Sequence, residues 1–261
     1  MMLGLFRKQP RPASQPRSRV NLGEPDVIYA VGDIHGCHRH LQVLLDKIRQ
    51  DAAQFSGRKV LVTLGDHIDR GPHSAAVMDW LSAPFKGDIE RVSLAGNHEA
   101  MMLDFLADPD LESAWLRNGG EETLTSYGID LPAFERARQR DRRAMLDFVV
   151  PADHVELLRS MPVMATTGQA VFVHAGIRPD LPLEQQTDSD LVWIRQPFLD
   201  EVRADGPLVV HGHTPAETPV IAGRRICVDT GAYATGALTA LRLTSGGYDF
   251  LQATLQDITT R

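Results

Sequence analysis

Six side chains that can bind metal ions lie in polar clusters, each of which follows a short apolar run of the chain. They are Asp33, His35, Asp66, Asn97, His174 and His213. Carboxylates combined with imidazoles suit divalent transition metals, whereas calcium and magnesium sites favour oxygen alone. Six ligands exceed what one ion needs if a position stays open for water. They match two ions that share a bridging carboxylate, an arrangement that can clamp both ends of an in-line displacement at phosphorus.

The apolar runs are the elements that must position these side chains. They cover residues 27–31, 60–64, 92–95, 170–173 and 208–210. Short runs rich in β-branched residues and ended by glycine are typical of buried strands. A lone Asp or His after a strand usually forms a turn or caps a backbone group. Five clusters that all follow strand-like runs favour one shared site instead.

Helices are predicted between the first three strands. One predicted helix carries Leu41, Leu44, Leu45 and Ile48 on one face, and a second covers residues 74–81. Alternating strands and helices predict an α/β fold, in which the ligand crevice lies beyond the carboxyl ends of the strands. All five polar clusters lie at that edge.

The remaining segments divide the chain into a tail and one domain. Residues 1–22 are expected to form a disordered basic tail, because residues 1–19 are basic and contain three prolines. Residues 23–261 are expected to form a single catalytic domain. Within it, residues 100–160 are charged, helical in composition and broken by Pro and Gly, which predicts a helical insertion beside the site. Residues 225–255 return to strand-like runs and are expected to finish a second sheet.

Composition excludes several classes of protein. The net charge of −7 argues against a general nucleic-acid binder, which usually has a basic face. Two cysteines cannot form a disulfide framework and suit a reducing cytosol, so a cytoplasmic location is expected. No window approaches 18 consecutive apolar residues, which argues against a membrane span.

Five sequence blocks, taken in order, resemble those of a known enzyme family. They are Gly32-Asp33-Ile34-His35-Gly36, Gly65-Asp66-His67-Ile68-Asp69-Arg70-Gly71, Gly96-Asn97-His98-Glu99, His174-Ala175-Gly176 and Gly212-His213-Thr214-Pro215. Their order, and the spacing of about thirty residues between the first three, resemble those found in the bacterial type of the phosphoprotein phosphatase family. This family belongs to the calcineurin-like metallophosphoesterases. The resemblance extends from about residue 26 to residue 243. It implies a β-sandwich flanked by helices in αββα layers.

The resemblance also implies a role for each metal ligand. Asp33, His35 and Asp66 would bind the first ion, and Asp66, Asn97, His174 and His213 the second. The ions are expected to be manganese, with iron or zinc also compatible.

Four further residues receive roles from the same resemblance. His98 would be the general acid, oriented by Asp69. Arg70 would bind the phosphoryl oxygens together with Asn97, and Arg195, which follows Trp193, would be a second phosphate-binding arginine. Two alternatives remain at this point: Asp69 and Arg70 could pair with each other at the surface, and Arg195 could be merely solvated.

Four features near these blocks have open or minor roles. His211 is expected to support the site or pack in the core rather than bind metal. His67, where many relatives carry Tyr, is expected at the surface or in packing, and Cys37 is expected to be packed. Residues 118–124 contain paired glycines and either edge the substrate cleft or form an ordinary turn between helices.

The resemblance implies hydrolysis of phosphomonoesters, with phosphoserine or phosphothreonine proteins as the expected substrates and a metal-bridging hydroxide as the nucleophile. The alternative enzyme is a diadenosine tetraphosphatase-like nucleotide hydrolase with the same sheet and metals. Such enzymes typically lack the Asp-Arg pair and carry Asp after the third-block histidine, whereas this chain has Asp69-Arg70 and Glu99. A catalytically silent binding protein would have lost a ligand, and none is missing.

Overall fold

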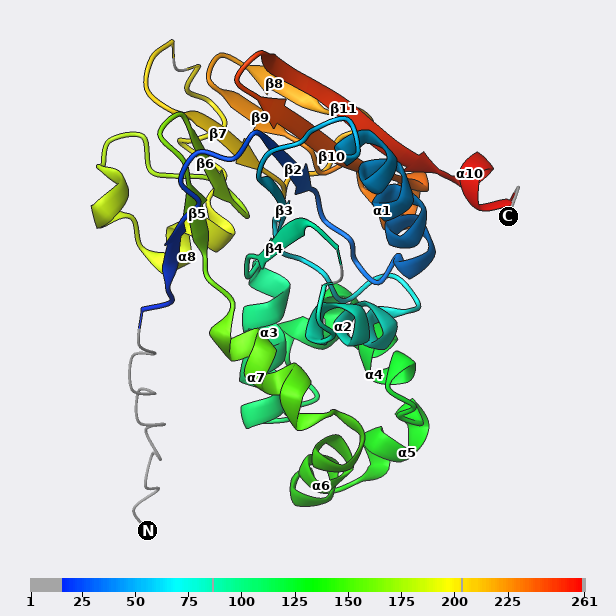
Figure 1. Cartoon of the computed structure of the whole chain (residues 1–261). Coiled ribbons are helices and arrows are strands. Elements are labelled where there is room, and N and C mark those ends of the chain that lie inside the picture. Colours follow the sequence, from blue (N-terminus) through cyan, green and yellow to red (C-terminus); the bar gives the residue numbers. More distant parts are fainter. Residues whose placement is uncertain (1–15, 86, 203, 260–261) are drawn as a thin grey trace.

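The computed structural model describes residues 16–85, 87–202 and 204–259, and two stacked β-sheets with helices outside them make up its architecture (Figure 1). The first sheet has the order β11 (Gly247–Thr254), β10 (Ala237–Thr244), β2 (Val27–Val31), β3 (Lys59–Thr63) and β4 (Ile89–Ser93). Strands β2, β3 and β4 are parallel, and β10 and β11 are antiparallel to their neighbours. The clusters that follow the three parallel strands therefore meet at one edge.

The second sheet brings the later clusters to the same place. Its order is β1 (Arg19–Asn21), β5 (Met164–Thr166), β6 (Ala170–Val173), β7 (Leu208–His211), β9 (Arg225–Cys227) and β8 (Val220–Ala222). Strands β6, β7 and β9 are parallel. His174 and His213 follow β6 and β7, so their side chains leave this sheet at its carboxyl edge.

Two sequence-based boundaries need correction. The predicted disordered tail ends too late, because Arg19–Asn21 pair in parallel with β5; residues 1–15 of that tail lie outside the described part of the chain. The final stretch also does not simply finish the second sheet. Within residues 225–255, β9 joins the second sheet beside β8, whereas β10 pairs with β2, and β11 pairs with β10, in the first sheet. The short helix α9 (Ala232–Thr235) makes this crossing, and left-handed glycines at 231 and 236 reverse the chain at its two ends.

A thin apolar layer lies between the sheets. Alternate residues of β2, such as Ile28 and Ala30, point into it, together with Phe172 from the facing sheet. Val27, Tyr29 and Val31 point the other way and pack under helices. The strands are thus buried on both faces, which is why they appear in the sequence as continuous apolar runs.

Helices cover the outer faces of the sandwich. Helix α1 (His38–Ala52) packs on β10 and β11, with α2 (Ser74–Ser82) beside it. On the other side, α8 (Asp188–Trp193) follows the 3-10 turn η2 (Leu183–Gln185), and its Leu191 carbonyl accepts the Ala175 N–H next to β6. A short α10 (Leu255–Thr259) ends the described chain. The predicted α/β sandwich with flanking helices is confirmed.

The predicted helical insertion forms a group of its own beside the sheets (Figure 1). It contains α3 (Asn97–Ala107), the π-turn η1 (Leu116–Gly120), α4 (Glu121–Ser126), α5 (Leu131–Arg136), α6 (Gln139–Val149) and α7 (Ala152–Ser160). Phe105, Trp115 and Phe134 pack together at its centre and are at most 1 % exposed. Helix α3 begins at Asn97, so the insertion is joined directly to the third polar cluster.

Truncating the layer between the sheets should be costly. Phe172 is fully buried there, so we expect Phe172→Ala to lower the free energy of unfolding by about 3–5 kcal/mol. The matched control is Phe148→Ala, because Phe148 is 90 % exposed; its effect should stay below about 0.5 kcal/mol. Urea denaturation of the two variants measures both values, and equal losses would contradict the packing described.

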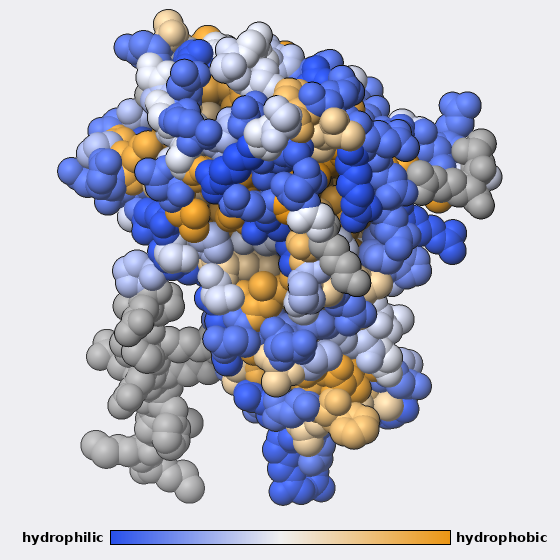
Figure 2. Space-filling view, viewed as in Figure 1, coloured by the Kyte–Doolittle hydropathy of each residue, from blue (hydrophilic) through white to orange (hydrophobic). Residues whose placement is uncertain are grey.

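None of the helices in the described residues combines the length and the apolar character needed to cross a bilayer. Figure 2 shows a face that is largely hydrophilic, with apolar residues in small separate patches.

Candidate metal centre

Tight turns at the strand ends aim the site residues inward. Five non-glycine residues in the described chain have positive φ: His35, Asp66, Asp69, Arg70 and His213. All five are residues that the sequence analysis singled out. Backbone in this region costs about 1–3 kcal/mol per residue and clusters at functional sites. The surrounding structure therefore maintains a strained arrangement at this edge of the sandwich.

Two motif glycines allow close approach to the carboxylates. A Cβ on Gly96 would collide with Asp66 Oδ1, and one on Gly212 would collide with Asp33 Oδ1. The glycines of these blocks are therefore needed because the backbone passes directly against the side chains that form the site.

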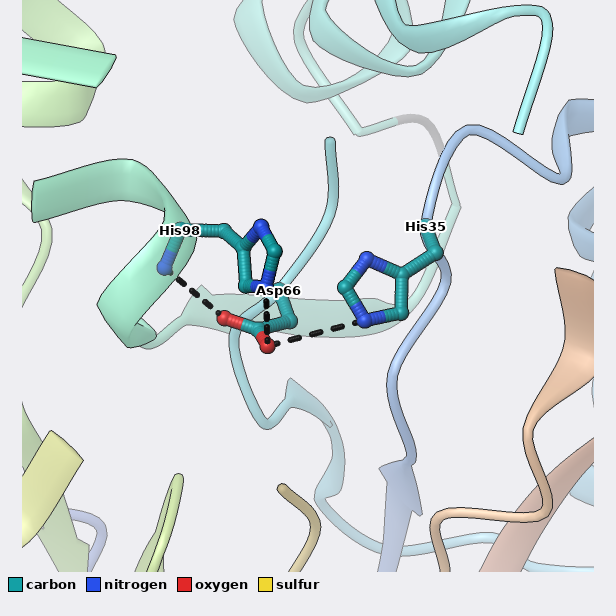
Figure 3. Close-up of side chains that lie close together, drawn as sticks. All are labelled: His35, Asp66 and His98. Carbon is teal, nitrogen blue, oxygen red and sulfur yellow. Dashed lines mark hydrogen bonds and ion pairs between the residues drawn. The ribbon is translucent and has the colours of Figure 1, made fainter. Parts of the chain in front are cut away.

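Asp66 lies at the centre of the site (Figure 3). Its carboxylate lies 3.6 Å from His35 Nε2 and 3.3 Å from His174 Nε2, and it accepts the backbone N–H of His98 at 3.1 Å. Asp66 is 2 % exposed. It contacts imidazoles that follow strands of both sheets, which is the position that a bridging ligand requires.

Two groups of ligand atoms share Asp66. His35, Asp66 and His98 form one, and Asp66, His174 and His213 form the other, with all ligand atoms in each group within 4.8 Å of one another. Asn97 Oδ1 lies 2.9 Å from His174 Nε2, beside the second group. Asp33 is outside both groups, and its carboxylate accepts the His213 backbone N–H at 3.1 and 3.2 Å.

The donor set fits divalent metal ions. His35 Nε2 and His213 Nε2 are buried and have no hydrogen-bond partner among the described residues. Burial lowers the pKa of His35 and that of His213 to about 3, so both imidazoles are neutral at pH 7, which is the form that binds metal. A buried nitrogen without a partner is costly unless something binds it.

The carboxylates give the site an excess of negative charge. Burial, reinforced by the nearby Asp229 and Asp66, raises the pKa of Asp33 well above its usual range. Burial alone would also raise the pKa of Asp66, but neighbouring imidazoles, that of His174 first, lower it well below its usual range. A bound cation would relieve the repulsion between these carboxylates.

His98 forms a hydrogen-bonded pair with Asp69 beside the metal groups. His98 Nδ1 lies 2.6 Å from Asp69 Oδ2, and both side chains are buried. Burial would lower the pKa of His98, but the carboxylates of Asp66 and Asp69 raise it. His98 Nε2 faces the site, 3.7 Å from Asp66 Oδ2. The surface pairing of Asp69 with Arg70 is therefore wrong, since Asp69 is fully buried and bonded to His98.

Both predicted phosphate-binding arginines lie at the rim of this site. Arg70 is partly exposed, and its Nη2 lies 3.3 Å from His98 Nε2. Its guanidinium lies over the ring of Tyr233 at 4.8 Å. Arg195 is exposed, and its Nη2 donates to the His213 carbonyl at 3.4 Å. Two permanent positive charges thus border the predicted ligands.

Sequence reasoning missed the role of Glu99. Its carboxylate accepts the backbone N–H groups of Asp66, His67 and Gly96 at 2.7–2.9 Å. It also lies 3.3 Å from His67 Nδ1, and His67 is fully buried, so of the two positions expected for His67 the packed one is correct. The only signal in the sequence was the three-residue spacing of Gly96 and Glu99, which allows the Glu half of a capping box at the start of α3; Gly96 has no side chain for the other half.

Other residues near the blocks have supporting positions. Asp229, missed at first, follows β9 as the ligands follow their strands, and its carboxylate accepts the Gly231 N–H. His211 is buried and belongs to neither ligand group, in agreement with the supporting or packing role predicted for it. Burial raises the pKa of the Cys37 thiol to about 11, in agreement with a packed side chain.

Two sheets that deliver carboxylates and imidazoles to one edge, with the hydrogen-bonded His98–Asp69 pair and two arginines beside them, are typical of a metal-dependent phosphoesterase. The family model of the calcineurin-like phosphoesterases matches residues 27–251. The chain belongs to this family, as the sequence blocks predicted, and it is an enzyme.

Individual relatives carry different names. A bis(5'-nucleosyl)-tetraphosphatase PrpE, asymmetrical, from Geobacillus thermodenitrificans is 30 % identical over 81 % of this chain and 88 % of its own length. Serine/threonine-protein phosphatase 2 from Salmonella typhimurium is 28 % identical over 83 % and 92 %. The cold-active protein-tyrosine phosphatase of a psychrophilic Shewanella shares the fold, with a TM-score of 0.56, 18 % identity and coverage of 91 % and 83 %. The names agree on the hydrolysis of a P–O bond and differ in substrate.

Proposed function

We propose that this enzyme hydrolyses phosphomonoesters, with phosphoserine and phosphothreonine proteins as its substrates. The observation that carries the proposal is the His98–Asp69 pair, 2.6 Å apart and directed at the metal groups. An alkoxide is a poor leaving group and needs a proton as the ester bond breaks, and a histidine whose pKa is raised supplies one.

The metal ligands in this proposal are those of the two sheet edges. Asp33, His35 and Asp66 would bind one ion, and Asp66, Asn97, His174 and His213 the other. When bound, two such ions supply a nucleophilic hydroxide and neutralise charge on the phosphoryl oxygens. We propose manganese, and metal analysis of the purified protein distinguishes it from iron and zinc, which accept the same donors.

The remaining residues bind the ester and move one proton. Arg70 and Arg195 would bind the phosphoryl oxygens as planar cationic forks, and Asn97 would add an amide donor. When Arg70 turns from His98 Nε2 to the phosphoryl oxygens, Nε2 would be free to carry the second proton of the imidazolium and give it to the leaving oxygen, while Nδ1 keeps its proton and its bond to Asp69. We also propose a cytosolic location, since both cysteines are free and buried.

A second candidate is asymmetric hydrolysis of dinucleoside tetraphosphates. The relative from Geobacillus thermodenitrificans, 30 % identical, carries that name. Its leaving group would be a nucleotide phosphate, which is stable as an anion and depends less on protonation. The Asp69–Arg70 pair and the buried His98 therefore favour the phosphomonoester.

Substrate ranking tests the proposal. With added manganese, we expect phosphoserine peptides to be hydrolysed with a higher kcat/KM than diadenosine tetraphosphate, because only the peptide makes full use of the general acid. Both compounds and p-nitrophenyl phosphate should be assayed on one enzyme preparation. A higher kcat/KM for diadenosine tetraphosphate would favour the second candidate and overturn the leading one.

A further inference from the structure

One segment of the helical insertion lies directly against the Asp69–Arg70 pair. It runs from Trp115 to Ser126, includes η1 and α4, and contains the paired glycines whose role the sequence left open. The Trp115–Ser126 segment is not part of either metal-binding group. The side chains of Trp115 and Thr123 nevertheless reach the Asp69 carboxylate.

Both oxygens of the Asp69 carboxylate accept hydrogen bonds from this segment. The indole N–H of Trp115 donates to Oδ2 at 2.7 Å, and the hydroxyl of Thr123 donates to Oδ1 at 2.6 Å. Oδ2 is the same oxygen that faces His98 Nδ1. All three side chains of this network are at most 1 % exposed. The direction of the carboxylate is therefore determined by donors that lie 46 and 54 residues away in sequence.

The segment also accepts hydrogen bonds from the backbone N–H groups of Asp69 and Arg70. The Asp69 N–H donates to Thr123 Oγ1 at 2.9 Å, and the Arg70 N–H donates to the Gly119 carbonyl at 3.2 Å. Asp69 and Arg70 are consecutive residues with positive φ, at +74° and +66°. Such backbone persists only when its surroundings enforce it. Thr123 and Gly119, as acceptors of these hydrogen bonds, contribute to that enforcement, together with Ser74, whose hydroxyl also accepts the Asp69 N–H at 2.9 Å.

The two glycines make this approach possible. Gly119 has φ of +103°, and a Cβ there would collide with the backbone N of Arg70. A Cβ on Gly120 would lie 2.6 Å from the ring of Trp115. Gly119 does not accept a side chain unless Arg70 moves, and Gly120 does not accept one unless Trp115 moves. The paired glycines are thus more than a turn between helices.

We infer that the Trp115–Ser126 segment positions three residues of the site: Trp115 and Thr123 orient Asp69, and through it His98, while Gly119 fixes the backbone of Arg70. This inference rests on the roles proposed above for His98 and Arg70. A purely structural role predicts something different. A phenyl ring at 115 would fill much of the same space, so only the loss of the N–H donor separates positioning from packing.

The first test uses the leaving group. Trp115→Phe and Thr123→Val each remove one donor to Asp69 and keep most of the side-chain volume. We expect each to lower kcat for a phosphoserine peptide by about 10–100-fold, the usual effect of losing a supporting hydrogen bond. The loss for p-nitrophenyl phosphate should be much smaller, and the manganese content and thermal midpoint should be retained.

The controls are a tryptophan and a threonine that do not contact Asp69 or Arg70. Trp80 contacts Phe85 and Arg91, and the exposed Thr125 donates to the Glu121 carbonyl in the same helix as Thr123. Trp80→Phe and Thr125→Val should leave both substrates unaffected. Equal losses on both substrates in Trp115→Phe and Thr123→Val, or no loss on either with the fold retained, would overturn the inference.

A second test addresses Arg70. Gly119→Ala should raise the inhibition constant of inorganic phosphate, because the added methyl group displaces the arginine that binds it. Gly128→Ala is the matched control, since Gly128 also has positive φ but nothing lies within 4 Å of its Cβ position. Similar phosphate inhibition in the two variants would contradict the role of Gly119.

A measurement without turnover separates this inference from the proposed function. The imidazole nitrogen resonances of His98, assigned by their loss in His98→Asn, should shift in Trp115→Phe and Thr123→Val but not in Trp80→Phe. Unshifted resonances would reject positioning by the segment. If the resonances shift in these two variants but the wild-type enzyme hydrolyses no phosphomonoester, the positioning is supported and the proposed function is rejected.

Discussion

Asp66→Asn is expected to remove hydrolysis of every phosphoester and to lower the amount of bound metal. Asp66 is the carboxylate shared by both ligand groups, within 3.3–3.6 Å of imidazoles from the two sheets. An amide has one oxygen and no charge, so it cannot bridge two cations as a carboxylate does. Metal ions contribute several kcal/mol of transition-state stabilisation, so the rate should fall by on the order of 10³-fold or more.

The measurement combines metal analysis with assays on a phosphopeptide and on p-nitrophenyl phosphate. Asn is close to Asp in size, so the fold should survive, and circular dichroism checks this. The control is Asp180→Asn, which removes an exposed carboxylate paired with Arg178 and should change neither activity nor metal content. An Asp66→Asn enzyme with two bound metals and near-normal activity would show that the bridging role is wrong.

His98→Asn should separate the general acid from the metal ligands. We expect both ions to stay bound, while kcat for a phosphoserine peptide falls by about 10²–10⁴-fold, the usual contribution of a general acid. The loss should be smaller for p-nitrophenyl phosphate, because nitrophenolate is stable as an anion and needs little protonation. The reason lies in the geometry, since Asp69 binds Nδ1 and leaves Nε2 facing the reacting groups.

The position of His98 makes the metal measurement decisive. Its imidazole lies within one of the two ligand groups, beside His35 and Asp66. Metal lost together with the imidazole would make His98 a ligand rather than an acid. Equal activity losses on both substrates with the metals retained would instead indicate that His98 stabilises charge. The control His73→Asn replaces an exposed histidine at the start of α2 and should affect neither quantity.

Much of the candidate site could be predicted from the sequence because it depends on local patterns. Each predicted ligand lies within a few residues of the end of a strand, and parallel strands bring their carboxyl ends to one edge. Apolar runs such as Val27–Val31 could therefore be combined with Asp33 and His35 without knowing the order of the strands. The same locality explains why α2, predicted over residues 74–81, lies close to that range, and why the four apolar residues predicted for the first helix are buried on α1.

The tertiary structure decided what depends on distant segments. No spacing pattern links Asp69 to Trp115 and Thr123, because these hydrogen bonds span 46 and 54 residues. Nor does local sequence reveal that β10 pairs with β2 across more than two hundred residues, since an apolar strand can enter either sheet. The sequence by itself thus determined which side chains could bind metal and at which edge they lie. Only the folded chain decided which buried donors orient Asp69 beside them, because a hydrogen bond between distant segments exists only once packing has brought its two partners together.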